Sequence, residues 1–175
     1  MDQGLIVAAR ARGQRGFTLI EMMITVAVIA ILALIVVPQF FKESRKTKSA
    51  TEVAPMFAEL SIREEQYKVD NTSYLATVAC PATPSAQGNP SSGCTSQADW
   101  ISLKVAPPET KLYCSYEVTV GAGSGTTVAD FSWSSPGGSW YYIEATCDMD
   151  GDSAKNSRYF TSSSETEIKK LDEGF

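Results

Sequence analysis

The alternation of apolar and polar positions divides the chain into regions of different periodicity. Residues 17–37, FTLIEMMITVAVIAILALIVV, are almost entirely apolar and contain one charged side chain, that of Glu21. At about 1.5 Å of rise per residue, these 21 residues would form a helix of roughly 30 Å, which matches the hydrocarbon core of a bilayer. We therefore predict a membrane-spanning helix here.

Residues 38–72 keep a helical periodicity but are amphipathic. Apolar side chains recur at steps of three and four residues, with Glu64 as the polar exception in the apolar stripe. Pro38 and Pro55 would each remove a backbone hydrogen bond, so kinks or local loss of helix are expected there. The sequence DNTS, which begins at Asp70, favours a turn, so we expect the helix to stop near this residue.

Turn-forming and β-forming residues follow in two blocks. Residues 73–110 are rich in Pro, Ser, Gly and Thr, and we expect a surface loop there. Residues 111–120 and 140–147 are rich in β-branched and aromatic residues, which predicts an antiparallel sheet within residues 111–175. The expected fold class is α+β: one long N-terminal helix, membrane-spanning in its first half, packed by its second half on a small C-terminal antiparallel sheet.

Charge is distributed unevenly along the chain, whose formal net charge is −5. Before Phe17 the chain has one acid, Asp2, and three bases, Arg10, Arg12 and Arg15. The positive-inside rule then predicts a cytoplasmic N-terminus and an exported remainder. Without this segment the net charge is −7, which argues against DNA as a partner because phosphate binding needs a positive field. The chain has no histidine and no recognisable catalytic constellation, so we do not expect an enzyme.

Three explanations of the apolar run differ in how they treat Glu21. A cleaved secretory signal would need small residues in an A-x-A-like arrangement after the run, and none is present. A plain membrane anchor leaves the carboxylate unexplained, although a carboxylate in a membrane helix costs roughly 2.5–3.5 kcal/mol. Cleavage after Gly16 would create an α-amino group on Phe17, and this cation could pair with Glu21 of a neighbouring chain.

The heptapeptide RGFTLIE at residues 15–21 resembles the class III signal of type IV prepilins and pseudopilins. The basic leader, the apolar run and Pro38 coincide with that pattern, and the likeness covers roughly the first third of the chain. It implies that prepilin peptidase removes residues 1–16 by cleavage between Gly16 and Phe17 and methylates the new N-terminus. It also implies that Phe17, Glu21 and Pro38 act in assembly.

The resemblance implies a structural subunit of a type IV pilus, a helical homo-oligomer used for adhesion, motility or uptake. The precursor would span the inner membrane of a Gram-negative bacterium and pass through an inner-membrane assembly platform to an extracellular filament. The alternatives are a pseudopilin of a type II secretion system and a minor, ligand-binding pilin. The segment Leu75–Cys80 departs from the glycine-containing run of the major pseudopilin, which favours a pilus subunit.

An even number of cysteines in an exported chain favours two disulfides. The four are Cys80, Cys94, Cys114 and Cys147. If residues 111–120 and 140–147 pair so that Cys114 lies opposite Cys147, Val120 lies opposite Tyr141, and both segments end together. We therefore favour Cys114–Cys147 as a cross-strand bridge and Cys80–Cys94 as the closure of the surface loop, out of three possible connectivities.

Two charged clusters have competing interpretations. The alternating carboxylates Asp148, Asp150 and Asp152 resemble the start of an EF-hand-type Ca²⁺ loop, although Ser153 and Tyr159 replace the turn glycine and the final acid. A solvated acidic turn explains them as well.

The basic cluster consists of Lys42, Arg45, Lys46 and Lys48. It can be a solvated stretch that contacts acidic neighbours in a filament, or a site for anionic lipid or DNA.

Overall fold

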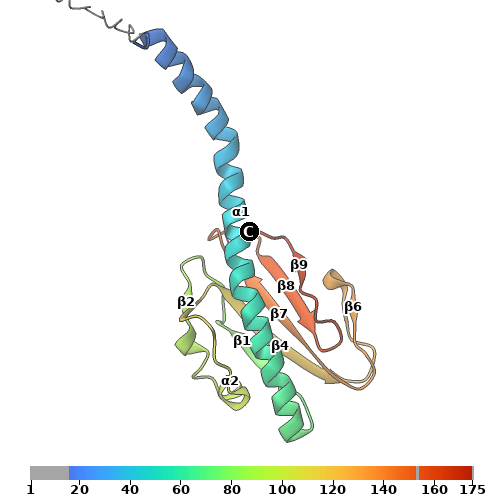
Figure 1. The fold of residues 1–175 in the computed structure, drawn as a ribbon. Helices are drawn as coiled ribbons and strands as arrows, with labels where there is room; N and C mark the ends of the chain where they lie inside the picture. The colour runs from blue at the N-terminus through green and yellow to red at the C-terminus, as the bar shows by residue number, and fades with distance from the viewer. Residues whose placement is uncertain (1–15, 153, 175) are drawn as a thin grey trace, which may run out of the picture. The chain divides into compact units, whose positions relative to one another are not determined.

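A computed structural model gives the fold and describes residues 16–152 and 154–174 (Figure 1). Two parts of the chain lie outside the described residues: residues 1–15, which include the three arginines of the predicted leader, and Ser153 of the predicted calcium loop. The chain divides into two compact units, Met1–Gln39 and Phe40–Phe175. We call the second unit the head and describe each unit by itself.

The helix α1, Leu19–Asn71, has 53 residues and contributes to both units. Its helical conformation continues through Pro38 and Pro55, so neither proline ends it, although each removes one backbone donor. The helix ends one residue after Asp70, as the turn-forming sequence there predicts. The long helix and the antiparallel sheet of the head confirm the α+β prediction.

The head contains one five-stranded antiparallel sheet with the strand order β1-β4-β7-β8-β9. Its strands are β1 (Thr77–Cys80), β4 (Cys114–Ala122), β7 (Ser139–Cys147), β8 (Ser157–Ser162) and β9 (Lys169–Leu171). Two short ribbons accompany it, β2 (Asn89–Pro90) with β3 (Lys111–Leu112) and β5 (Thr127–Val128) with β6 (Trp133–Ser134). The other elements are the helix α2 (Ala98–Leu103) and the 3-10 turns Ser91–Gly93 and Ala129–Phe131.

The register of β4 and β7 is the predicted one. Cys114 lies opposite Cys147, and Val120 lies opposite Tyr141. Disulfides join Cys114 to Cys147 and Cys80 to Cys94, which is the pairing that this register favours. The central strand pair is thus closed covalently at one end.

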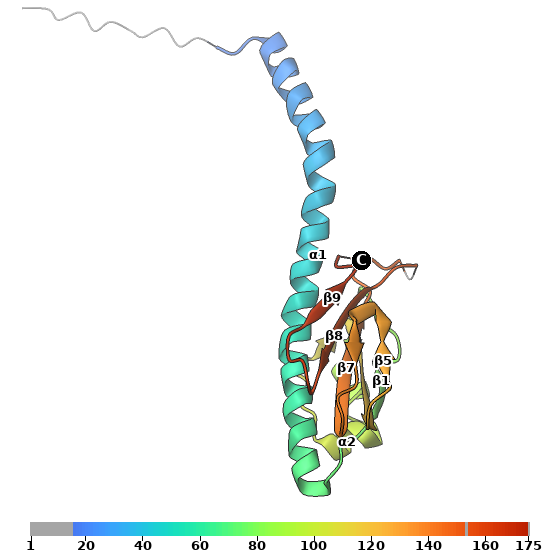
Figure 2. The same ribbon diagram turned by 90° about the vertical axis from the view of Figure 1, so that its right-hand side faces the viewer.

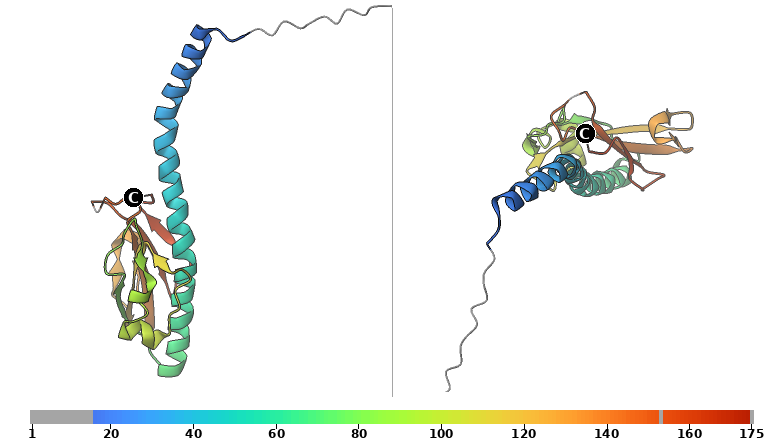
Figure 3. Two further views of the ribbon diagram at one scale, coloured as in Figure 1. Left: turned by 90° about the vertical axis from the view of Figure 1, so that its left-hand side faces the viewer. Right: turned by 90° about the horizontal axis from the view of Figure 1, so that it is seen from above.

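Side-chain alternation gives the sheet two separately packed faces. The odd-numbered residues of β7, from Tyr141 to Cys147, join the core between the sheet and α1. From α1 that core receives Val53, Met56, Phe57 and Leu60. Figure 2 and the left view of Figure 3 show the head segment of α1 running along this face.

The opposite face of the sheet carries a second, smaller core beside the β5–β6 ribbon. Its four buried residues are all aromatic: Phe131, Trp133, Trp140 and Phe160. Strand β7 supplies Trp140 from the position next to Tyr141, so neighbouring residues of one strand serve different cores. The sheet is therefore buried on both faces over part of its area.

The region expected to be a loop, residues 73–110, contains regular structure that periodicity did not predict. Strand β1 pairs with β4 at the edge of the sheet, and α2 lies next to β1. The Asp99 carboxylate accepts the N–H of Val78 at 2.6 Å, and the indole N–H of Trp100 donates to the Val78 carbonyl at 3.4 Å. These two side chains satisfy backbone groups of an edge strand, which would otherwise be open to pairing with another chain.

The close approach of Gly121 to Trp140 gives a stability prediction. A Cβ at Gly121 would lie 2.3 Å from the indole ring, so the buried indole must shift to accommodate Gly121→Ala. We expect this variant to lose about 1–3 kcal/mol of unfolding free energy through overpacking. Urea unfolding of the full chain in detergent micelles, followed by tryptophan fluorescence, measures the loss.

The matched control is Gly137→Ala. Its Cβ would meet no atom within 4 Å, and Gly137 does not have a positive φ. We expect this control to unfold at the wild-type urea concentration. Equal unfolding midpoints for Gly121→Ala and Gly137→Ala would refute the packing argument.

Candidate functional site

The start of α1 is fixed by a reciprocal pair of hydrogen bonds between Thr18 and Glu21. The Glu21 N–H donates to the Thr18 hydroxyl at 3.3 Å, and the Thr18 N–H donates to the Glu21 carboxylate at 3.4 Å. Two donors that a helix N-terminus leaves unpaired are thereby satisfied, which is the arrangement called a capping box. Glu21 therefore has a structural role within a single chain.

The predicted cleavage site is accessible. A cavity of about 520 Å³ is lined by Gly16, Phe17, Thr18 and Glu21, and the Phe17 side chain is 73% exposed. A Cβ placed at Gly16 would meet no atom within 4 Å. Packing among the described residues therefore gives no reason for a glycine at this position.

The first half of α1 has an apolar surface with nothing packed on it among the described residues. Its Leu, Ile, Val and Met side chains from Leu19 to Val37 are all at least 47% exposed. The helix is long and apolar enough to cross a membrane, and none of its most apolar 18-residue stretch is buried. Such a surface is unfavourable in water, so it needs a bilayer or other protein to cover it.

Within the head, the buried carboxylate of Glu52 joins α1 to the start of the sheet. Its two oxygens accept the N–H of Tyr113 at 2.9 and 3.1 Å, and one of them also accepts the N–H of Cys114 at 3.0 Å. The Tyr116 hydroxyl donates to the same carboxylate at 2.9 Å. Burial raises the pKa of Glu52, while these donors and the charge of Lys48 act in the opposite direction.

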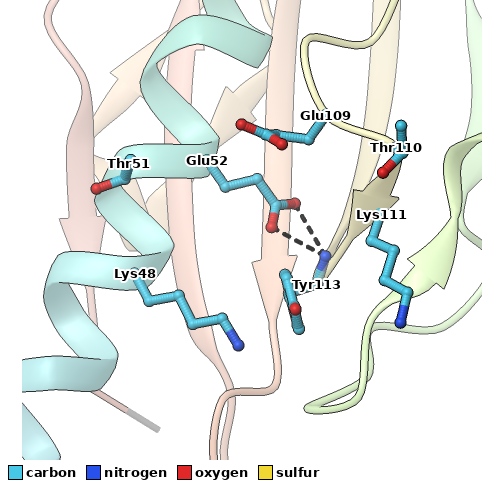
Figure 4. A pocket seen from close by; sticks show the side chains of 7 residues that line it. All are labelled: Lys48, Thr51, Glu52, Glu109, Thr110, Lys111 and Tyr113. Atoms are coloured by element: carbon cyan, nitrogen blue, oxygen red, sulfur yellow. Dashed lines mark hydrogen bonds between the residues drawn. The ribbon is translucent and has the colours of Figure 1, made fainter.

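Glu52 and Tyr113 also line a cavity of about 410 Å³ between α1 and the segment that leads into β4 (Figure 4). The remaining lining residues are Lys48, Thr51, Glu109, Thr110 and Lys111. The Lys48 ammonium lies 3.4 Å from the centre of the Tyr113 ring, a cation–π contact. The cavity therefore combines a buried carboxylate that is already hydrogen-bonded with ammonium groups closer to solvent.

Comparison with known proteins matches residues 11–37 to the family described as the prokaryotic N-terminal methylation motif. Over 39% of its length the chain is 38% identical to the Type IV wide pilus major component PilA4 of Thermus thermophilus. Over 42% of its length it is 35% identical to the Type II secretion system core protein G of Dickeya chrysanthemi. The N-terminal part of the chain is therefore similar to a type IV pilus subunit and to a core protein of type II secretion.

The chain spans about half the length of the two relatives, 51% of PilA4 and 52% of protein G. No solved structure matches the chain significantly.

A second buried carboxylate of the pilin-like head, Glu64, holds the turn that leads from α1 to β1. Its side chain is 0% exposed, one oxygen accepts the N–H of Leu75 at 3.0 Å, and the other oxygen has no partner among the described residues. Burial raises the pKa of Glu64 to about 7, and the neighbouring charge of Glu65 adds to the effect. The carboxyl group is thus neutral in the folded head at acidic pH.

This pKa predicts that the head loses stability as the pH rises. Between the ordinary pKa of 4.5 and about 7, the unfolded chain ionises Glu64 while the folded chain keeps it protonated, so ionisation favours unfolding. Relative to wild type, we expect Glu64→Gln to gain up to about 3 kcal/mol of unfolding free energy on going from pH 4 to pH 8. Urea unfolding of both proteins at the two pH values measures this difference.

The control for this experiment is Glu65→Gln, because Glu65 is exposed and its carboxylate accepts the Tyr74 hydroxyl at 2.9 Å rather than a backbone N–H. We expect a much smaller change with pH for this variant. A stability difference between Glu64→Gln and wild type that stays constant from pH 4 to pH 8 would contradict the account.

The three carboxylates of the predicted calcium loop accept backbone N–H groups in the structure. Asp148, Asp150 and Asp152 each accept a backbone N–H two or three residues later, at 2.6, 3.1 and 3.0 Å. Within residues 16–152 and 154–174, no group of three acidic, histidine or cysteine side chains is placed to hold a metal ion. In the structure these carboxylates act as turn-forming groups.

Sequence reasoning placed Gly16, Phe17 and Glu21 together at one site but missed the capping box. The T-x-x-E spacing of Thr18 and Glu21 carries that signal. The sequence also did not reveal the anchoring role of Glu52, because the N–H groups that donate to Glu52 lie 61 or more residues away along the chain. No local pattern indicates such a contact.

Proposed function

We propose that this chain is the structural subunit of a type IV pilus. In this proposal, prepilin peptidase cleaves between Gly16 and Phe17 and methylates the new N-terminus. Residues 17–37 hold the mature chain in the inner membrane until it enters the filament through the assembly platform. The observation that carries the proposal is the exposed apolar half of α1 directly after an accessible signal of the methylation-motif family.

The same proposal assigns roles to the remaining parts. Residues 38–72 connect the filament core to the sheet of the head, with Pro38 at the start of this segment. Residues 73–110, closed by Cys80–Cys94, and the sheet within residues 111–175, bridged by Cys114–Cys147, form the outer surface. Two disulfides support a head that must stay folded outside the cell, because cross-links stabilise mainly by restricting the unfolded chain.

Assembly would replace the capping box with a contact between chains. Once Gly16 is removed, the α-amino group of Phe17 is a cation next to the Thr18 cap, and Glu21 of a neighbouring subunit is its proposed partner. Inside a bundle of apolar helices, water would not screen this pair. The pair would therefore select one axial register between neighbouring helices.

Two substitutions separate the charge of Glu21 from its capping role. Glu21→Gln keeps a side chain that can complete the capping box but removes the charge, whereas Thr18→Ala removes the cap and keeps the charge. We expect both variants to be cleaved, Glu21→Gln to lose assembly, and Thr18→Ala to assemble. Gel analysis of cleavage and the yield of sheared filaments measure the two steps, and normal filaments from Glu21→Gln would refute the pairing.

A pseudopilin of a type II secretion system is the second candidate, because protein G accounts for several of the relatives. Deletion of the gene distinguishes the two functions. A pilus subunit predicts loss of surface filaments with normal protein secretion. Loss of secretion with unchanged surface filaments would instead assign the chain to the secretion system.

A further inference from the structure

The positive charge of the head is concentrated at the start of its helical segment. Four of the 12 basic residues that follow residue 17 lie between Lys42 and Lys48, where Glu43 is the only acid. The rest of the chain, residues 49–175, has 8 basic and 17 acidic residues. A filament packs identical heads together, so acidic surfaces will repel one another unless they meet this positive region.

The cavity between α1 and the segment before β4 places a lysine of a second element beside this positive region, in a lining that also includes Glu52 and Glu109. Lys48 comes from α1 and Lys111 from β3, and Figure 4 shows their ammonium groups on either side of Tyr113. Neither lysine forms an ion pair with a carboxylate of the described residues. Glu52 is not fully available as an ion-pair partner for these lysines, because its oxygens already accept the four hydrogen bonds described above.

At the other end of the same helical segment, Asp70 has an unfavourable position. It is exposed in the last turn of α1, where the carbonyl groups of a helix carry partial negative charge and disfavour an acid. Lys68, the basic residue of that turn, donates to the Tyr74 hydroxyl instead. Arg63 and Lys104 line the same depression as Asp70, yet neither lies within ion-pair distance of its carboxylate in the described structure.

A filament needs a contact between two different surfaces of the same chain, because repetition of such a heterologous contact produces an open helix. We infer that Asp70 of one subunit binds between Lys48 and Lys111 of another. This inference rests on the proposed function and names the head contact within it. The contact gives Asp70 a cationic partner and gives Lys48 and Lys111 an anionic one.

The contact also sets a distance between subunits. Lys48 and Asp70 are 22 residues apart on α1. At about 1.5 Å of rise per residue, they are separated by roughly 33 Å along the helix axis. Two subunits that share this contact are therefore offset by roughly this length along the filament, if their α1 helices are nearly parallel to it.

Charge reversal tests the contact in cells that produce the full chain and its assembly machinery. We expect Asp70→Lys and Lys111→Glu each to lower the yield of sheared filaments at least about tenfold, because like charges would then meet. The double variant should recover most of the wild-type yield. Glu117→Lys is the matched control, since Glu117 is exposed on β4 and forms no ion pair in the described part of the chain, and it should assemble normally.

Cross-linking tests proximity without altering these charges. All four native cysteines are in disulfides, so Thr110→Cys in the cavity and Asn71→Cys beside Asp70 introduce the only thiols. Oxidised filaments of this double variant should give a ladder of linked subunits on a non-reducing gel. Thr119→Cys with Asn71→Cys should give none.

The outcomes separate this inference from the proposed function. Wild-type filaments together with full assembly of both charge-reversed single variants would overturn the Asp70 contact and leave the pilus assignment intact. Failure of the double charge variant to recover, or absence of the Thr110–Asn71 ladder in well-formed filaments, would also overturn it. A wild-type chain that never occurs in filaments would overturn both.

Discussion

The apolar surface of the first half of α1 is the constraint on which the rest of this protein depends. No part of the described chain covers that surface, and the head has its own complete core from Val53 onward. Such a surface needs a bilayer or other apolar helices to cover it. In the proposed function, the bilayer covers it before assembly and neighbouring helices cover it in the filament.

Within the head, α1 is joined to the sheet by two kinds of contact. Apolar side chains from Val53 to Leu60 pack in the core, and Glu52 and Glu64 add hydrogen bonds to backbone groups on either side of this stretch. Burying a carboxylate is unfavourable, so such contacts contribute definite placement more than stability. They fix where the head segment of α1 lies along the sheet.

The main elements could be predicted because they depend on local patterns. The apolar run, the helical stripe around Glu64 and the register of Cys114 with Cys147 all follow from periodicity and from the ends of the β-rich segments. The helix α2 and the aromatic core around Trp133 could not be predicted in this way. Their positions depend on which face of the sheet remained open, and that is decided by contacts distant in sequence.

The functional residues also differ in whether a local pattern or a contact distant in sequence reveals them. The predicted processing signal is a contiguous heptapeptide, so Gly16, Phe17 and Glu21 can be proposed from the sequence alone. The predicted calcium loop was ambiguous because carboxylates at alternating positions serve equally well as ligands and as acceptors for turn N–H groups, which is their role here. That Lys48 and Lys111 line the same cavity could be seen only in the tertiary structure, because the two residues belong to different elements.

The central claim is that a processed, methylated helix becomes the core of a surface filament. Mass spectrometry of the chain from sheared surface filaments tests it most directly. The account predicts a mature chain that begins with N-methylated Phe17 and retains both disulfides. A chain that keeps its leader, begins at another residue or occurs only in the membrane fraction would contradict it.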